Sequence, residues 1–157
     1  MGANSAAVGK GALGASGRAR RNAGAYLYAR DFRAVALKAG SPLVRAYLLG
    51  HSLELYLKAY LLTRGFSERA LRTRRLRHDL SALLNEAESR GLGDHLRISP
   101  ELRRDLRSLN DPYARAALEY VSWWHLLAPP SVPDSRRLSR FAANLDTLVR
   151  RLVADAV

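Results

Sequence analysis

Apolar side chains recur along this chain every three to four residues, the spacing of helices packed on a common core. A break or kink is expected at Asn110-Asp111-Pro112, because proline interrupts a helix. No stretch shows the period of two that indicates a strand. The expected fold is therefore all-α, an antiparallel helical bundle of four long helices plus a kinked or split segment. The pattern predicts helices over residues 23–39, 44–62, 80–90, 100–110, 113–124 and 135–156.

Several of these boundaries carry capping residues. Ser41 before Pro42 is typical of an N-cap and a first helical turn, and Asp79 is expected to cap the helix that follows it. Two helices joined by so short a turn should pack antiparallel. In the first helix, the predicted buried face consists of Tyr28, Phe32, Val35, Ala36 and Ala39.

The stretch from Val44 to Leu62 organises the rest of the chain. Its apolar residues occupy nearly every angle of a helical wheel, so we expect other helices on all sides. His51, Glu54 and Lys58 form one polar stripe on it. Two interpretations are open: a Glu54–Lys58 surface pair with the lysine extended to water, or a buried polar slot that contacts a ligand or a second subunit.

Composition narrows the class of protein. The 157 residues fit one domain, expected over residues 23–157, with residues 1–22 as a disordered basic tail. The chain has no cysteine, and no apolar leader or anchor is apparent at its start, so we expect a cytoplasmic protein without membrane contact. Its formal charge of +12 favours a polyanionic partner, chiefly nucleic acid.

The strongest candidate for anion binding precedes the helix at residue 80. Arginines cluster there and His78 stands at the helix entrance, where backbone N–H groups already favour anions. No cofactor motif or metal-ligand set is found, because the His51/Glu54 spacing has no second copy. Trp123 and Trp124 beside His125 could stack on bases or pack in the core. The clustered arginines are Arg69, Arg72, Arg74, Arg75 and Arg77.

Three motifs together resemble the HEPN family (higher eukaryotes and prokaryotes nucleotide-binding). They are the Glu-Leu-x-Leu-Lys-Ala sequence at residues 54–59, the His-Asp-Leu helix start at residues 78–80, and LNDPYAR at residues 109–115. The resemblance covers roughly residues 23–120 and departs from the family at Glu119-Tyr120, where related sequences carry Arg-Tyr followed by proline. It implies an HEPN-like helical bundle, a homodimer and a link to RNA, often in toxin–antitoxin or defence systems beside a small nucleotidyltransferase.

Catalytic members of that family are metal-independent ribonucleases that use an arginine and a histidine separated by four to six residues. By this resemblance, Arg72 and His78 are the candidate catalytic pair, with His78 as general base and Arg72 stabilising phosphate charge. The spacing also fits the pairs Arg45/His51 and Arg90/His95. The candidate nucleic-acid or nucleotide contacts are His51, Glu54, Lys58, Arg75, Arg77, Asp79 and Tyr113.

The sequence alone is therefore compatible with three functions. The first is an RNA- or nucleotide-binding HEPN-like protein, the second a metal-independent endoribonuclease, and the third a non-catalytic protein-interaction module that docks an acidic partner.

Overall fold

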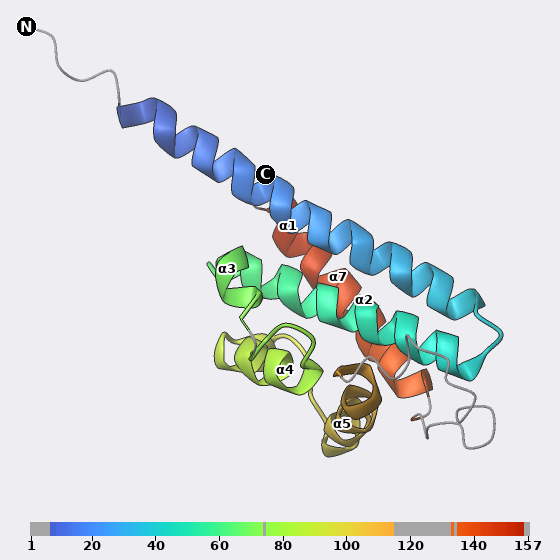
Figure 1. Cartoon of the computed structure of the whole chain (residues 1–157). Coiled ribbons are helices and arrows are strands. Elements are labelled where there is room, and N and C mark those ends of the chain that lie inside the picture. The colour runs from blue at the N-terminus through green and yellow to red at the C-terminus, as the bar shows by residue number, and fades with distance from the viewer. Residues whose placement is uncertain (1–6, 74, 115–132, 134, 156–157) are drawn as a thin grey trace, which may run out of the picture.

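A computed structural model describes residues 7–73, 75–114, 133 and 135–155 of the chain. Every regular element in these residues is a helix, as the sequence predicts, and none of them combines the length and hydropathy that crossing a bilayer requires. Trp123, Trp124, His125 and Glu119-Tyr120 lie outside the described residues. The order is α1 (Ala7–Lys38), α2 (Pro42–Thr63), α3 (Glu68–Leu71), α4 (Leu80–Ser89), the 3-10 helix η1 (Leu92–Asp94), α5 (Pro100–Ala114) and α7 (Ser135–Ala154) (Figure 1).

Helices α1 and α2 form an antiparallel pair joined by a tight turn, as predicted (Figure 1). Ser41 is the N-cap of α2: its hydroxyl accepts a hydrogen bond from the Val44 N–H at 3.5 Å, and Pro42 is the first helical residue. The Arg45 guanidinium donates to the Ala39 carbonyl oxygen at 2.7 Å. That bond satisfies a carbonyl just beyond the end of α1 and ties the turn to α2.

Helix α2 is the central element of the fold. It packs against α1, α4, α5 and α7, which explains why apolar side chains surround its axis. Its 22 residues span about 33 Å, so one helix reaches every part of the core. The largest fully buried side chains on α2 are Leu49, Leu53, Tyr56, Leu57, Tyr60 and Leu61.

The buried face of α1 differs from the predicted one. Ala36 is buried as predicted, but Tyr28 and Val35 are 66% and 55% exposed, and Tyr26 and Ala29 are buried in their place. The buried face is therefore turned toward Tyr26 and Ala29 by less than one helical residue, which is roughly 100°. Small side chains at Ala29 and Ala36 let α1 approach α2 closely enough for the Ser52 hydroxyl to donate to the Ala29 carbonyl oxygen at 2.8 Å. Close approach at the small residue Ala29 and burial of Tyr26 against Tyr56 of α2 together characterise the buried face of α1.

Helix α1 also begins earlier than the sequence predicts. Residues 7–22, expected as part of a disordered basic tail, form the first part of α1, which projects beyond the other helices in Figure 1. Extending an existing helix adds one hydrogen bond per residue without a new nucleation step. The anchored part of α1 can therefore propagate into this alanine-containing stretch.

Helix α5 continues past the predicted break. It runs through Asn110-Asp111-Pro112 to Ala114, with Leu102, Leu106 and Leu109 buried as predicted. A proline removes only one backbone donor, and buried Tyr113 anchors the last turn beyond it. The Asn110 side chain does not cap a new helix but bonds to α4, as described below.

Candidate functional site

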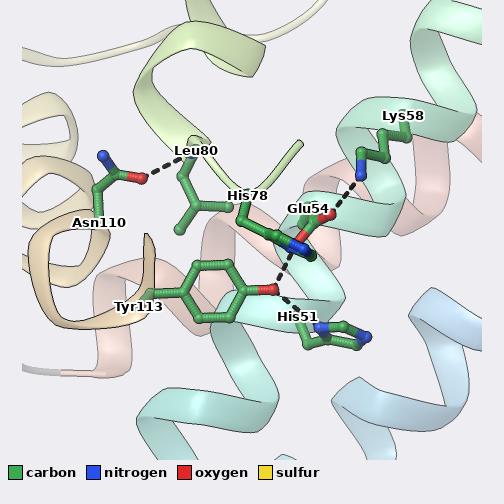
Figure 2. Close-up of polar contacts among 7 residues, drawn as sticks. All are labelled: His51, Glu54, Lys58, His78, Leu80, Asn110 and Tyr113. Carbon is green, nitrogen blue, oxygen red and sulfur yellow. Dashed lines mark hydrogen bonds and ion pairs between the residues drawn. The ribbon is translucent and has the colours of Figure 1, made fainter. Parts of the chain in front are cut away.

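The polar stripe of α2, formed by His51, Glu54 and Lys58, is buried or partly buried in the protein. Glu54 is only 2% exposed, which excludes the surface-pair interpretation. Its Oε1 atom accepts a hydrogen bond from the Lys58 ammonium, one turn along the same helix. Its Oε2 atom accepts from the Tyr113 hydroxyl at 2.5 Å and pairs with His78 Nδ1 at 3.1 Å (Figure 2). A buried carboxylate requires such partners, and this one has three.

These partners arrive from separate elements. Lys58 lies on α2, Tyr113 on the last turn of α5, and His78 on the stretch that precedes α4. Gly50 makes the approach of Tyr113 possible, because a Cβ atom at that position would lie 2.9 Å from Tyr113 Cδ2. Only glycine leaves room there for the aromatic ring against the backbone of α2.

The charge of Glu54 is stabilised inside the protein. Burial alone raises the pKa of the Glu54 carboxyl, but the Lys58 ammonium and the hydrogen bonds that the carboxylate accepts outweigh burial. Its pKa therefore lies below the ordinary value of 4.5. Glu54 is ionised near neutral pH and offers a fixed negative charge to the residues around it.

His51 contacts the same Tyr113 hydroxyl as Glu54 (Figure 2). Its Nδ1 atom is 2.8 Å from the Tyr113 hydroxyl oxygen, and its ring packs edge-on against Phe32 with centroids 4.5 Å apart. A phenol has one hydrogen, which Tyr113 gives to Glu54, so His51 Nδ1 acts as the donor. The sequence therefore placed His51, Glu54 and Lys58 correctly on one stripe, but Tyr113 is what connects the histidine to the pair.

Asn110 joins α5 to the start of α4. Its Oδ1 atom accepts a hydrogen bond from the Leu80 N–H at 2.7 Å (Figure 2). Its Nδ2 atom donates to Asp79 Oδ1 at 3.2 Å. Asp79 also caps α4 as predicted, accepting from the Ala82 N–H at 2.9 Å. Together with Tyr113, Asn110 brings the three motifs of the sequence into one polar network.

His78 is the member of this network that reaches the surface, with a side chain 47% exposed. Because ionised Glu54 can only accept, His78 Nδ1 carries the hydrogen of their bond. The lone pair of the neutral ring is then on Nε2. A histidine whose tautomer is fixed by a carboxylate is chemically suited to accept a proton from a substrate hydroxyl.

The residues from Glu68 to Asp79, which we call the basic segment, present arginines to solvent. Arg69, Arg72, Arg75 and Arg77 are exposed, while Leu71 and Leu76 are buried and anchor the segment. Arg75 pairs with Glu86 at 2.9 Å. Arg74 lies outside the described residues.

The predicted arginine–histidine pairs do not form direct contacts. Among the described residues, the Arg72 guanidinium contacts Glu68 at 3.5 Å and has no contact with His78. His95 Nε2 lies 2.8 Å from an Arg64 nitrogen, whereas Arg90 lies over the Phe66 ring. Arg45 binds the Ala39 carbonyl oxygen instead of His51.

The sequence gives no role to Gly50, and it names Phe32 as a buried residue and Asn110 as part of a motif without predicting their contacts in the network. The place of Asn110 in the same motif as Tyr113 was a usable signal. In the described part of the chain, no group of three or more histidine or acidic side chains is arranged to hold a metal ion.

Comparisons with models of protein families, with curated proteins and with solved structures find no match to this chain.

Proposed function

We propose that this chain is an HEPN-like RNA- or nucleotide-binding protein, a four-helix bundle that contacts phosphate groups through the basic segment. The observation that supports this proposal is the construction of that segment. Its four described arginines are exposed, while two buried leucines and the His78–Glu54 contact fix its backbone on the core. A preorganised row of guanidinium groups binds phosphates with little loss of chain entropy. The formal charge of +12 adds long-range attraction.

The test is the salt dependence of binding to a fluorescent single-stranded RNA, followed by anisotropy from about 50 to 200 mM salt. Arg77→Ala is expected to weaken binding and to reduce the slope of log K against log salt by about 0.7, the value for one phosphate contact on a single strand. Arg77 is exposed and has no ion pair with a described residue, so its loss leaves the fold intact.

Arg140→Ala is the matched control for that experiment. Arg140 is also exposed, but it lies near the start of α7, which packs beside the start of α2, whereas the basic segment follows the end of α2. Its removal should leave the slope unchanged. Wild-type protein that fails to bind RNA at low salt would refute the proposal.

A second candidate function is a metal-independent endoribonuclease, and the fixed tautomer of His78 favours it. In this reaction His78 Nε2 takes the proton of a ribose 2′-hydroxyl, and the 2′-oxygen attacks the adjacent phosphorus. The bond to the 5′-oxygen breaks, and that oxygen takes a proton. Arg72, whose side chain is 80% exposed and pairs with Glu68 at 3.5 Å, would turn to the phosphate and stabilise the charge that develops there.

Cleavage is tested on a denaturing gel with end-labelled structured RNA and a metal chelator. We expect fragments with a 2′,3′-cyclic phosphate from wild type and none from Arg72→Ala or His78→Ala. His95→Ala is the matched control, because His95 contacts Arg64 rather than the Glu54 network. Intact RNA in the wild-type lane would leave the binding function alone.

We further propose a homodimer that uses the outer face of α1. Tyr28 and Val35 lie two turns apart on this face and are both more than half exposed, and Leu27 and Leu37 are also exposed. A second copy would remove these side chains from water. Light scattering after size exclusion should give twice the mass of 17.4 kDa, and Val35→Glu should give the single mass.

The resemblance to the HEPN family extends the proposal to a cellular setting: a cytoplasmic toxin–antitoxin or defence system with a small nucleotidyltransferase partner. The competing proposal is an interaction module in which the basic segment docks an acidic protein. Co-purification with a co-expressed nucleotidyltransferase, compared between wild type and Arg77→Ala, separates a partner that uses the basic segment from one that does not.

A further inference from the structure

A small polar cavity lies between α4 and α5, on the far side of the α4 entrance from His78. Its volume is about 70 Å³. About 10–15 Å³ of such space holds one water molecule, so there is room here for a small polar group such as a phosphate. Its lining residues are Ser81, Leu84, Asn85, Arg103, Leu106 and Arg107.

The groups at this cavity are hydrogen-bond donors over an apolar floor. Leu84 and Leu106 are buried, whereas the Ser81 hydroxyl, the Asn85 amide and two guanidinium groups supply the polar atoms. None of the described lining residues carries a carboxylate. A small cavity with donors and no lining acid is complementary to an oxyanion.

The charges around the cavity leave one cation uncompensated. Arg103 is held by an ion pair with Glu88, which fixes the position of its guanidinium. Arg107 is exposed and has no ion pair with any described residue. Glu86, the other acid on α4, pairs with Arg75 and Arg90. Arg107 is therefore the lining arginine that no acid of α4 neutralises.

The cavity lies at the start of α4, next to the end of the basic segment. Arg107 lies one helical turn before Asn110, which bonds to the Leu80 N–H and to Asp79. Ser81 is the second residue of α4 and follows the His78-Asp79-Leu80 stretch directly. A strand that contacts the basic segment can thus continue around the start of α4 into this cavity.

We propose that this cavity binds a phosphate group, with the Arg107 guanidinium as the principal ligand and Ser81 and Asn85 as additional donors. The inference rests on the proposed RNA or nucleotide function and names a second phosphate position for it. The phosphate belongs either to the RNA backbone or to a free phosphate compound, and two measurements distinguish these sources.

The first measurement is the RNA-binding slope of Arg107→Ala beside Arg104→Ala. Arg104 lies on the same helix and is exposed, but it does not line the cavity and is 4.0 Å from Glu101. We expect Arg107→Ala to lose on the order of three- to tenfold in affinity and about 0.7 in slope, and Arg104→Ala to match wild type.

The second measurement is a titration of ¹⁵N-labelled protein with inorganic phosphate, read from the amide shifts of Ser81 and Asn85. Saturable shifts in wild type and Arg104→Ala that vanish in Arg107→Ala support the site. If wild type binds no RNA, the proposed function fails, and these shifts would still assign the cavity to free phosphate. If Arg107→Ala behaves as Arg104→Ala in both measurements, the inference is overturned while RNA binding by the basic segment stands.

Discussion

Gly50 is the position where a single added methyl group tests the packing of the network. In Gly50→Ala the new Cβ would lie 2.9 Å from Tyr113 Cδ2 and 3.2 Å from Cε2. These contacts are shorter than van der Waals distance, so the ring must move away from α2. Because the Tyr113 hydroxyl is bound to Glu54 Oε2 at 2.5 Å, moving the ring breaks or lengthens that bond.

The expected free-energy change is the sum of opposing effects. Replacing glycine by alanine inside a helix stabilises by about 1 kcal/mol. Overpacking costs about 1–3 kcal/mol, and leaving a buried carboxylate without one of its donors costs about 1–3 kcal/mol more. The net destabilisation is about 1–5 kcal/mol. At about 2–4 °C per kcal/mol for a chain of this size, a mid-range loss of about 3 kcal/mol lowers the melting temperature by about 6–12 °C.

Urea unfolding followed by circular dichroism measures this change. Gly24→Ala is the matched control, since Gly24 is also helical but has no neighbour within 4 Å of an added Cβ, and it should be stabilising by about 0.5–1 kcal/mol. In a Tyr113→Leu background the cost of Gly50→Ala should shrink, because the clashing ring is gone. Gly50→Ala protein as stable as wild type would refute the close packing of Tyr113 on α2.

Three other expected outcomes concern the same network. Glu54→Gln should destabilise by about 2–4 kcal/mol in urea unfolding, because it leaves the Lys58 ammonium without its partner in a largely buried position. The pKa of Glu54 is lowered in the folded state, so its contribution to the free energy of unfolding is full above about pH 4.5 and is lost as the pH falls below that value. Between pH 6 and pH 3, the free energy of unfolding should therefore decrease less in Glu54→Gln than in wild type. Asn110→Ala should lower the free energy of unfolding by about 1–2 kcal/mol, because the Leu80 N–H loses its acceptor. The control Asn144→Ala, at an exposed position of α7, should leave it nearly unchanged. Equal losses in the two variants would contradict the role of Asn110.

Local patterns determined most of what could be predicted about the fold. The caps at Ser41 and Asp79 form hydrogen bonds within three residues of themselves, so the sequence contains all their information. The prediction for α1 is right at Ala36 and wrong at Tyr28 and Val35, because the close approach of α2 at Ala29 turns these two side chains outward. That approach depends on α2 and is not encoded within α1.

The candidate site shows the same division between local and long-range information. His51, Glu54 and Lys58 share one helix, so their common stripe followed from the helical period. The contact of Tyr113 with Glu54 joins residues 59 positions apart and required the complete packing of α5 on α2. The roles of Arg72 and His78 stay a prediction from the family resemblance, and the structure adds that Arg72 pairs with Glu68 on its own helix turn.

The energetics of a buried ion pair bear on why Glu54 occupies the core. Desolvating a carboxylate and an ammonium costs several kcal/mol, and apolar residues of similar volume often stabilise a protein equally well or better. Stability alone therefore gives no reason for Glu54 and Lys58 at these positions. Their distinctive effect is on His78, whose Nδ1–H is held by a carboxylate that three donors keep ionised and fixed. A network that orients one half-exposed histidine beside a row of arginines has a stronger rationale at a phosphate-binding surface than in a purely structural core.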